Sequence, residues 1–446
     1  MSQGTVVPML QSFAALREKR TLLAYRALVL FSVLYFFRPE DFIPALTLIP
    51  IGKIAGGIAL LALVFGTKSK ERGRLPIECK LLLLLLVQML LTIPFAFWRG
   101  GSMDIVINKF SKGVIVALLI ALVVTTVREL RKLLYIQAAA VALVTVGSLL
   151  AHNTVNGRLM GIQKGILENP NDLAINIAIN FPLCMAFMFA AKGGLRKSLW
   201  AMSLLTMLYA VVATYSRSGM IAMVVTAIIC LWEFGVRDGR RILLMSAAIV
   251  GVFGLALVLT KPNYLLRLES LVRGNIEGSG DKGSLEARTE LLRQSLRLMV
   301  HNPVFGVGPG NFKVITGMWQ VAHNTYTEVG AETGFPGFIL FCAVLISAVR
   351  RVRRVRKLPG YADDENLRLW TNGLWASLAA YLAGALFAST EYNLFPYFMV
   401  GYICALYRIA SKPSDEATPA NGSAQDGDMK ERGQSSKGER EHAWSR

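Results

Sequence analysis

Charged side chains are scarce in this sequence. Asp, Glu, Lys and Arg together make up 17% of the 446 residues, whereas hydrophobic residues make up 54%. A soluble domain of this length needs a larger share of polar side chains to cover its surface. The shortage of charge therefore excludes an ordinary soluble globular protein and directs attention to the apolar runs along the chain.

Cysteine and histidine are rare as well. The five cysteines lie in apolar runs or at the cytoplasmic edge of one, and none falls in a segment predicted to face the outside. No structural disulfide is therefore expected. The cysteines and the four histidines show no CxxC or His-rich spacing of the kind that holds a metal ion. We expect no metal site and no cofactor.

Apolar runs close to bilayer-spanning length recur through the whole chain. They cover residues 21–37, 42–66, 80–97, 113–127, 133–151, 172–191, 198–214, 219–234, 242–260, 335–349, 369–388 and 394–407. Runs of this kind predict helices that have the lipid bilayer as their solvent. The fold class is therefore an all-α polytopic membrane protein with about twelve transmembrane helices, and the first run is an uncleaved anchor.

The sequence is strongly basic, with a formal net charge of +19. Lys and Arg collect in alternate connections between the apolar runs, above all at 350–368 and after residue 407, whereas the short connections on the other side contain few. This alternation follows the positive-inside rule, by which basic connections stay in the cytoplasm. We predict a multi-pass protein of the bacterial inner membrane with both termini in the cytoplasm. Nucleic acid is not expected as a partner.

Two segments differ from the membrane portion, which spans residues 1–410. Residues 411–446 are rich in Ser, Gly, Lys, Glu and Asp, and this composition predicts a disordered cytoplasmic tail. Residues 261–334 form an extracytoplasmic connection far longer than a compact helical bundle needs. Long connections of this kind usually carry function. We predict that this loop is the catalytic loop and that it is largely helical.

Arg288 lies in the predicted helix 284–300, with Ser284 as its N-cap and Asn302 beyond its end. At helical spacing Arg288 points out of an apolar face formed by Leu285, Leu292, Leu296 and Met299. Two interpretations are open: the side chain snorkels to a lipid headgroup, or it turns its guanidinium toward an anionic substrate. We favour the second.

Arg217 is the only charged residue between Leu199 and Cys230, and it lies at the outer turn between two apolar runs. An arginine there can simply anchor the chain at the membrane interface. Its neighbours Ser216 and Ser218 are small and leave its surroundings open. The functional interpretation is a planar guanidinium that binds diphosphate oxygens in a bidentate manner.

His323 begins a stretch rich in small residues. If this stretch is helical, Glu328 and Glu332 lie on the face opposite the one shared by His323, Tyr326, Thr327, Gly330 and Gly334. Glycines leave open space in front of the imidazole, and histidine suits general-base work near neutral pH. The alternative is a hydrogen-bonded structural histidine.

The run GVGPGNF at 306–312 is rich in glycine but does not predict nucleotide binding. It lacks the preceding strand and the following Lys-Ser/Thr that a phosphate-binding loop requires. Turn formation accounts for it better.

Several of these residues together resemble the signature of the O-antigen ligase/polymerase superfamily. The signature residues, which follow the sequence HNPVFGVGPGNF, are His323, Asn324, Glu332, Gly334 and Gly337. The SRSG at 216–219 and the ENPND at 168–172 are similar to patches seen in the same superfamily. The resemblance extends from about residue 168 to residue 337.

The resemblance implies a GT-C-type membrane glycosyltransferase that inverts the anomeric centre without a metal. Its donor would be a polyprenyl-diphosphate-linked glycan, and its acceptor a lipid or a glycan. The resemblance also implies that Arg217, Arg288 and His323 correspond to the essential arginines and histidine of the family. We further expect Asn324, Tyr326 and Arg158 to bind substrate.

The acceptor is left open by the sequence. We expect ligation of O-antigen to lipid A-core, with polymerisation of repeat units or transfer to protein as alternatives. A lipid-linked-saccharide flippase predicts functional charges along a central cavity, whereas an enzyme predicts them clustered at the outer membrane surface. A purely structural envelope protein predicts that Arg217, Arg288 and His323 can all be replaced without loss.

Overall fold

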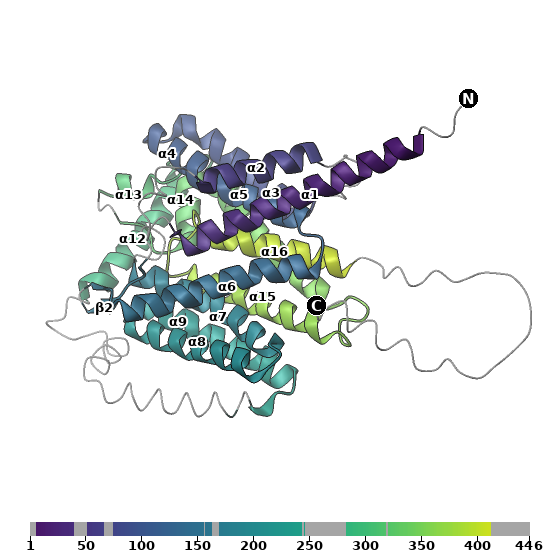
Figure 1. Ribbon diagram of the computed structural model, residues 1–446. Coiled ribbons are helices and arrows are strands. Elements are labelled where there is room, and N and C mark those ends of the chain that lie inside the picture. The colour runs from purple at the N-terminus through teal and green to yellow at the C-terminus, as the bar shows by residue number, and fades with distance from the viewer. Residues whose placement is uncertain are drawn as a thin grey trace, which may run out of the picture.

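The computed structural model describes residues 6–39, 51–66, 75–155, 157–162, 169–242, 245, 282–317 and 320–411. Across these residues the chain is built almost entirely of helices (Figure 1). In chain order the α-helices are α1 (Val6–Phe37), α2 (Ile51–Gly66), α3 (Ile77–Thr92), α4 (Arg99–Ile105), α5 (Ser111–Val123), α6 (Val127–Leu150), α7 (Pro170–Ala190), α8 (Gly194–Ala213), α9 (Arg217–Cys230), α12 (Lys282–His301), α13 (Phe312–Ile315), α14 (Thr325–Val355), α15 (Glu365–Gly384) and α16 (Phe395–Ala410).

Shorter elements complete the description. Strands β1 (Thr154–Val155) and β2 (Arg158–Leu159) form an antiparallel hairpin. One 3-10 segment and two π-helical segments continue neighbouring helices; they are η4 (Ile93–Phe95), η5 (Val106–Phe110) and η6 (Leu231–Arg237).

Seven helices within the described residues are long and apolar enough to cross a membrane. They are Ile77–Phe95, Arg99–Val123, Val127–Leu150, Pro170–Ala190, Gly194–Ala213, Arg217–Arg237 and Thr325–Val355. Two shorter apolar helices, Leu22–Phe37 and Phe395–Ala410, match two more of the expected runs. The chain is therefore a polytopic α-helical membrane protein, as its composition predicts.

The expected number of about twelve spans stays a prediction. The run 369–388 is helical as α15, but α15 is not among the seven helices apolar enough to cross a membrane. It packs against α7 and α9, so Thr371, Asn372 and Ser377 are buried among other helices. Nearly all of the run 242–260 and the first part of the run 42–66 lie outside the described residues, as does the predicted tail beyond residue 411.

The helices run back and forth between two ends of a bundle (Figure 1). We call the end that holds β1–β2, α12 and α13 the hairpin end. We call the opposite end, where α6 and α15 begin and α14 and α16 finish, the basic end. At the hairpin end the start of α14 meets the end of α15, where the Thr325 amide donates to the carbonyls of Ala385 and Ala388, both at 2.9 Å.

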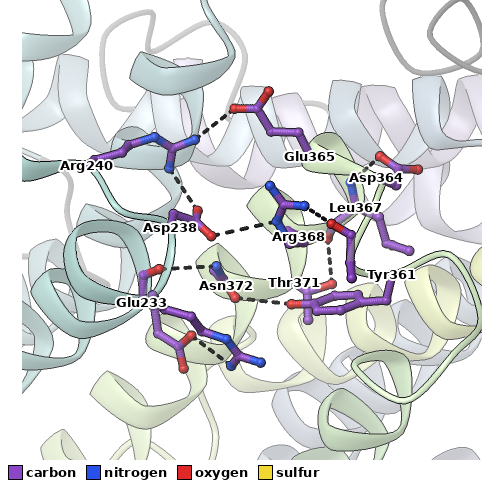
Figure 2. Close-up of polar contacts among 12 residues, drawn as sticks. Glu233, Asp238, Arg240, Tyr361, Asp364, Glu365, Leu367, Arg368, Thr371 and Asn372 are labelled. Atoms are coloured by element: carbon purple, nitrogen blue, oxygen red, sulfur yellow. Dashed lines mark hydrogen bonds and ion pairs between the residues drawn. The ribbon is translucent and has the colours of Figure 1, made fainter.

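Ion pairs connect the helix ends at the basic end (Figure 2). Glu233 of η6 accepts from Arg356, just beyond α14, at 2.8 Å. Asp238 pairs with Arg240 at 2.9 Å and with Arg368 of α15 at 3.8 Å. These contacts hold the connections after η6 and α14 against the start of α15.

Buried polar groups also join helices within the bundle. The fully buried carboxylate of Glu78 in α3 accepts from Arg351 Nε of α14 at 2.9 Å and from Ser347 Oγ at 2.8 Å. Gln137 of α6 donates to Asn180 of α7 at 2.8 Å. Away from water, each of these groups needs the partner it has.

Candidate active site

The turn that carries Arg217 is held by a network of polar side chains at the hairpin end. Arg158 of β2 donates from Nε to the Thr214 carbonyl at 3.0 Å and from Nη2 to Asn171 Oδ1 at 2.9 Å. Ser216 Oγ donates to the same Asn171 oxygen at 2.7 Å. Two predicted site residues, Arg158 and Arg217, therefore belong to adjoining elements, and Arg158 fixes the turn before α9.

Arg217 is the first residue of α9. Ser216 is the N-cap, and its Oγ accepts from the Gly219 amide at 3.1 Å. A Cβ on Gly219 would lie 2.1 Å from the Cβ of Ala174, so only glycine lets α9 approach α7 this closely. The half-buried Arg217 thus stands at a fixed helix start.

Arg288 lies on α12, which confirms the predicted helix but not its details. The helix begins at Lys282, so Ser284 is inside it and is not its N-cap. The buried row is Leu291, Ser295 and Met299, whereas two leucines of the expected face, Leu292 and Leu296, are 36% and 46% exposed. Arg288 is half-buried at the end of the buried row.

The buried row of α12 packs against α14. A Cβ on Gly330 would lie 2.4 Å from the Sδ of Met299, which shows how closely the two helices approach. Arg288 precedes Met299 by eleven residues, three helical turns, and therefore lies on the same side of α12. Its side chain therefore leaves α12 on the face that packs against α14, and its charge reaches His323.

His323 is not part of a helix, which corrects the expected helical face. Helix α14 begins at Thr325 with Asn324 as its N-cap, whose side chain accepts from the Thr327 amide at 3.1 Å. His323 itself has a φ of 53°, in the left-handed region that few side chains adopt. Left-handed residues of this kind often occur at functional sites, where the surrounding structure holds them.

The residues on both sides of His323 are anchored. The Ala322 amide donates to Glu328 Oε2 at 3.0 Å, and Ser389 Oγ donates to the same carboxylate oxygen. Asn324 Nδ2 donates to the Leu386 carbonyl at 3.2 Å. These bonds hold the backbone of His323 in place without using its imidazole.

The imidazole of His323 lies within electrostatic reach of Arg288. Burial, together with the positive charge of Arg288, lowers the pKa of His323 from 6.5 to about 4. The imidazole is therefore neutral at physiological pH, with one ring nitrogen free to accept a proton. The structure brings together two of the predicted catalytic residues from elements 35 positions apart in the chain.

A carboxylate of the family signature organises the glycine-rich run. Glu332 of α14 accepts from the amides of Gly310 at 2.7 Å and Phe312 at 3.0 Å, and from the Tyr392 hydroxyl. The Gly308 amide donates to the Glu332 carbonyl at 2.9 Å. The run 306–312 is therefore a turn-rich strap bound to α14, which confirms that it serves turn formation.

Helix α14 changes direction where the strap crosses it. Gly334 has φ 71° and ψ −177°, outside the helical region, and a Cβ there would meet the Val304 carbonyl at 2.7 Å. Gln88 of α3 donates to the carbonyls of Val304 and Thr333 at 2.9 and 3.2 Å. The short helical segment between His323 and this kink is fixed at both of its ends.

The remaining predicted substrate ligands have partners inside the protein. The Tyr326 hydroxyl donates to the Leu382 carbonyl at 3.0 Å, and Asn324 caps α14 as described above. Both residues stand beside His323, but their polar groups serve the fold, so a role in substrate binding stays a prediction. Of the ENPND patch, Glu168 lies outside the described residues, and Asn169 caps α7 by accepting from the Asn171 amide at 2.9 Å.

Arg217 and the Arg288–His323 pair lie at the same end of the bundle. Near the end of α15, a Cβ on Gly384 would touch Ile175 of α7 at 2.9 Å and Ala222 of α9 at 3.9 Å. The next residue, Ala385, accepts from the Thr325 amide. Helix α15 thus lies between the start of α9, with Arg217, and the start of α14, beside His323.

Fold and site together define a polytopic α-helical membrane protein with arginines and a neutral histidine at one end of its bundle. Residues 202–342 match the family model described as O-antigen ligase. The match supports membership of the O-antigen ligase superfamily. The matched segment includes Arg217, Arg288 and His323 but not Arg158. No curated protein matches the sequence.

Proposed function

We propose that this protein is an inverting, metal-independent glycosyltransferase of the O-antigen ligase type. It moves a glycan from a polyprenyl-diphosphate donor to an acceptor hydroxyl, with lipid A-core as the acceptor. The observation that carries the proposal is the packing of α12 against the start of α14, which brings Arg288 within electrostatic reach of His323 inside the segment that matches the O-antigen ligase family. A cation beside an uncharged base is the combination that this transfer needs.

The two arginines act on the donor. The planar guanidinium groups of Arg217 and Arg288 bind the diphosphate and stabilise the negative charge that grows on it as it leaves. The two arginines thereby supply the positive charge at the leaving diphosphate that a metal ion supplies in other glycosyltransferases. The extended lipid tail lies among the apolar helices.

His323 acts on the acceptor. The acceptor hydroxyl oxygen attacks the anomeric carbon from the face opposite the diphosphate and forms the new glycosidic bond. The bond between that carbon and the phosphate oxygen breaks, and the electron pair leaves with the polyprenyl diphosphate. The hydroxyl proton passes to the free imidazole nitrogen of His323. The anionic donor offsets the charge of Arg288, which raises the pKa of His323 from its value of about 4 in the free protein toward the range of an effective base.

The position of the charges supports an extracytoplasmic active site. Exposed basic residues at the basic end, among them Arg128, Lys192, Arg353 and Arg354, are the kind that the positive-inside rule keeps in the cytoplasm. We propose that the hairpin end, with Arg217, Arg288 and His323, faces the periplasm of a bacterial inner membrane. Accessibility of single cysteines at Gly317 and Arg353 to a membrane-impermeant thiol reagent tests this orientation: Gly317→Cys reacts in intact spheroplasts, and Arg353→Cys reacts only after lysis.

The experiment that tests the activity uses the purified full-length protein in nanodiscs. It is supplied with a polyprenyl-diphosphate oligosaccharide, EDTA and either lipid A-core or a second copy of the donor. Product on lipid A-core in the presence of EDTA supports the ligase. Product only on the second donor identifies a polymerase. Absence of product with both, together with movement of the donor between leaflets, identifies a flippase and contradicts the proposal.

A further inference from the structure

A large groove has its mouth at the basic end, the end of the bundle opposite the candidate active site. Its volume is about 1110 Å³, slightly above the range of about 300–1,000 Å³ that is common for ligand sites. Helices α6, α7 and α8 and the first turn of α15 line it. The groove is shared by four helices, so it is a feature of the fold rather than of one loop.

The mouth of the groove is strongly cationic. The five basic residues that line it are Arg128, Arg131, Lys132, Lys192 and Arg196. Arg131 lies 5.9 Å from the centre of the Trp370 ring and is near enough to Arg196 for their like charges to repel each other. Gathering like charges at one place is unfavourable unless an anion joins them.

The protein itself supplies little negative charge to this mouth. The single carboxylate in the lining is Glu365, and it is paired with Arg240 at 3.0 Å (Figure 2). Arg240 is in turn bound to Asp238 at 2.9 Å. Over the described part of the chain, none of the five basic residues at the mouth forms an ion pair with a carboxylate.

Beyond the mouth the lining becomes aromatic and then aliphatic. Tyr135, Phe187 and Trp200 form a cluster with ring centres 5.4 to 5.7 Å apart. Farther along α6 the lining residues are Ala139, Ala142, Leu143 and Val146. From Arg128 to Val146 the helix extends about 27 Å at 1.5 Å per residue, close to the thickness of a bilayer's hydrocarbon core.

The order of these three parts of the groove lining matches the order of the parts of a phospholipid. A cationic mouth, an aromatic zone and an apolar channel follow one another as headgroup, interface and acyl chain do in a membrane. An inorganic phosphate would use the cations but leave the channel empty. Tyr135 and Leu143, 51% and 58% exposed in the protein alone, are open to an acyl chain.

We propose that the groove between α6 and α8 binds an anionic glycerophospholipid from the membrane leaflet at the basic end. The phosphate headgroup lies among Arg128, Arg131, Lys132 and Arg196, and one acyl chain follows the lining of α6 past Leu143. The bound lipid neutralises the repulsion between Arg131 and Arg196 and fills the space between the two helices. This binding needs no glycan donor and no transfer reaction.

Lipid retention by the full-length protein tests the proposal. The protein in detergent is titrated with phosphatidylglycerol or phosphatidylcholine, and bound lipid is counted by native mass spectrometry. The wild type is expected to retain phosphatidylglycerol about tenfold more strongly than phosphatidylcholine. The double variant Arg131→Gln/Arg196→Gln is expected to lose that preference. The matched control, Arg353→Gln/Arg354→Gln, removes two exposed charges at the same end but outside the groove, and it is expected to keep the preference.

Two further measurements keep the proposal open to contradiction if the double variant fails to fold. Leu143→Trp leaves every charge in place but fills the channel, so it is expected to weaken phosphatidylglycerol retention. Inorganic phosphate at millimolar concentration is expected not to displace the lipid. Equal retention of both lipids by the wild type, unchanged retention by Leu143→Trp, or displacement by phosphate would each overturn the proposal.

Discussion

The charge of Arg288 acts directly on His323: together with burial, it lowers the pKa of the imidazole to about 4. The two residues come from different elements, α12 and the loop before α14, and the packing of Met299 against Gly330 brings those elements together. A cation and a neutral base within electrostatic reach of each other form an arrangement in which an anionic donor and a hydroxyl acceptor can meet. The following predictions test this arrangement and the parts of the fold that maintain it.

Replacing Arg288 should change the pH dependence of transfer as well as its rate. Burial and the Arg288 charge both depress the pKa of His323, so the base is lost only as pH falls toward about 4. Arg288→Gln removes one of the two causes and raises this pKa toward its ordinary value of 6.5. The acid limb of the kcat/KM profile should move to higher pH in Arg288→Gln and stay in place in Arg288→Lys. An acid limb that is the same in both variants and the wild type would contradict the proximity of the two residues.

Removing the Glu332 carboxylate should release the strap. Glu332→Ala leaves the amides of Gly310 and Phe312 without their acceptor, at a cost of about 1–3 kcal/mol for each buried group left unsatisfied. We expect a lower unfolding temperature in detergent and a loss of transfer. The control is Glu290→Ala on α12, where an exposed pair with Arg293 at 3.1 Å contributes little. Equal unfolding temperatures for the two variants would show that the strap is held by other contacts.

The kink at Gly334 should tolerate no side chain. Its φ of 71° and ψ of −177° belong to a region that is nearly exclusive to glycine, and the Val304 carbonyl fills the space where a Cβ would lie. Gly334→Ala is therefore expected to destabilise the protein by at least about 1–3 kcal/mol. Gly360→Ala is the matched comparison, because Gly360 also has a positive φ of 78° but no atom within 4 Å of the added Cβ. The unfolding temperatures of the two variants separate crowding of the added Cβ from backbone strain. A smaller loss of unfolding temperature in Gly334→Ala than in Gly360→Ala would contradict this account of the kink.

The sequence predicts where the helices lie along the chain better than it predicts which of their faces pack together. Runs such as 133–151 and 172–191 correspond closely to α6 and α7, because a bilayer demands apolar length and little else. The packed face of α12 is different. Leucines at 292 and 296 were expected beside Met299, yet they are exposed in the protein alone, because an apolar face can serve lipid or protein equally well.

Around His323 the sequence contains a signal that the helical interpretation overlooked. Asparagine is a favoured N-cap residue, and Asn324 in that role places His323 before the helix rather than on its face. Two acidic residues one turn apart, Glu328 and Glu332, also stand in an otherwise apolar stretch. Such residues need partners when buried, but the partner of Glu332 lies twenty positions earlier, in a glycine-rich run whose path only the fold determines.

The most direct measurement of the central claim compares glycan transfer by the purified wild type with transfer by His323→Ala. The assay contains a polyprenyl-diphosphate oligosaccharide, lipid A-core and EDTA, and a matched His152→Ala variant, altered at an exposed histidine of the hairpin end, serves as the control. We predict product from the wild type and from His152→Ala and a loss of at least about a hundredfold in His323→Ala, the usual share of a general base. All three proteins should unfold at similar temperatures. Undiminished transfer by a folded His323→Ala variant would contradict the assignment of His323 as the base.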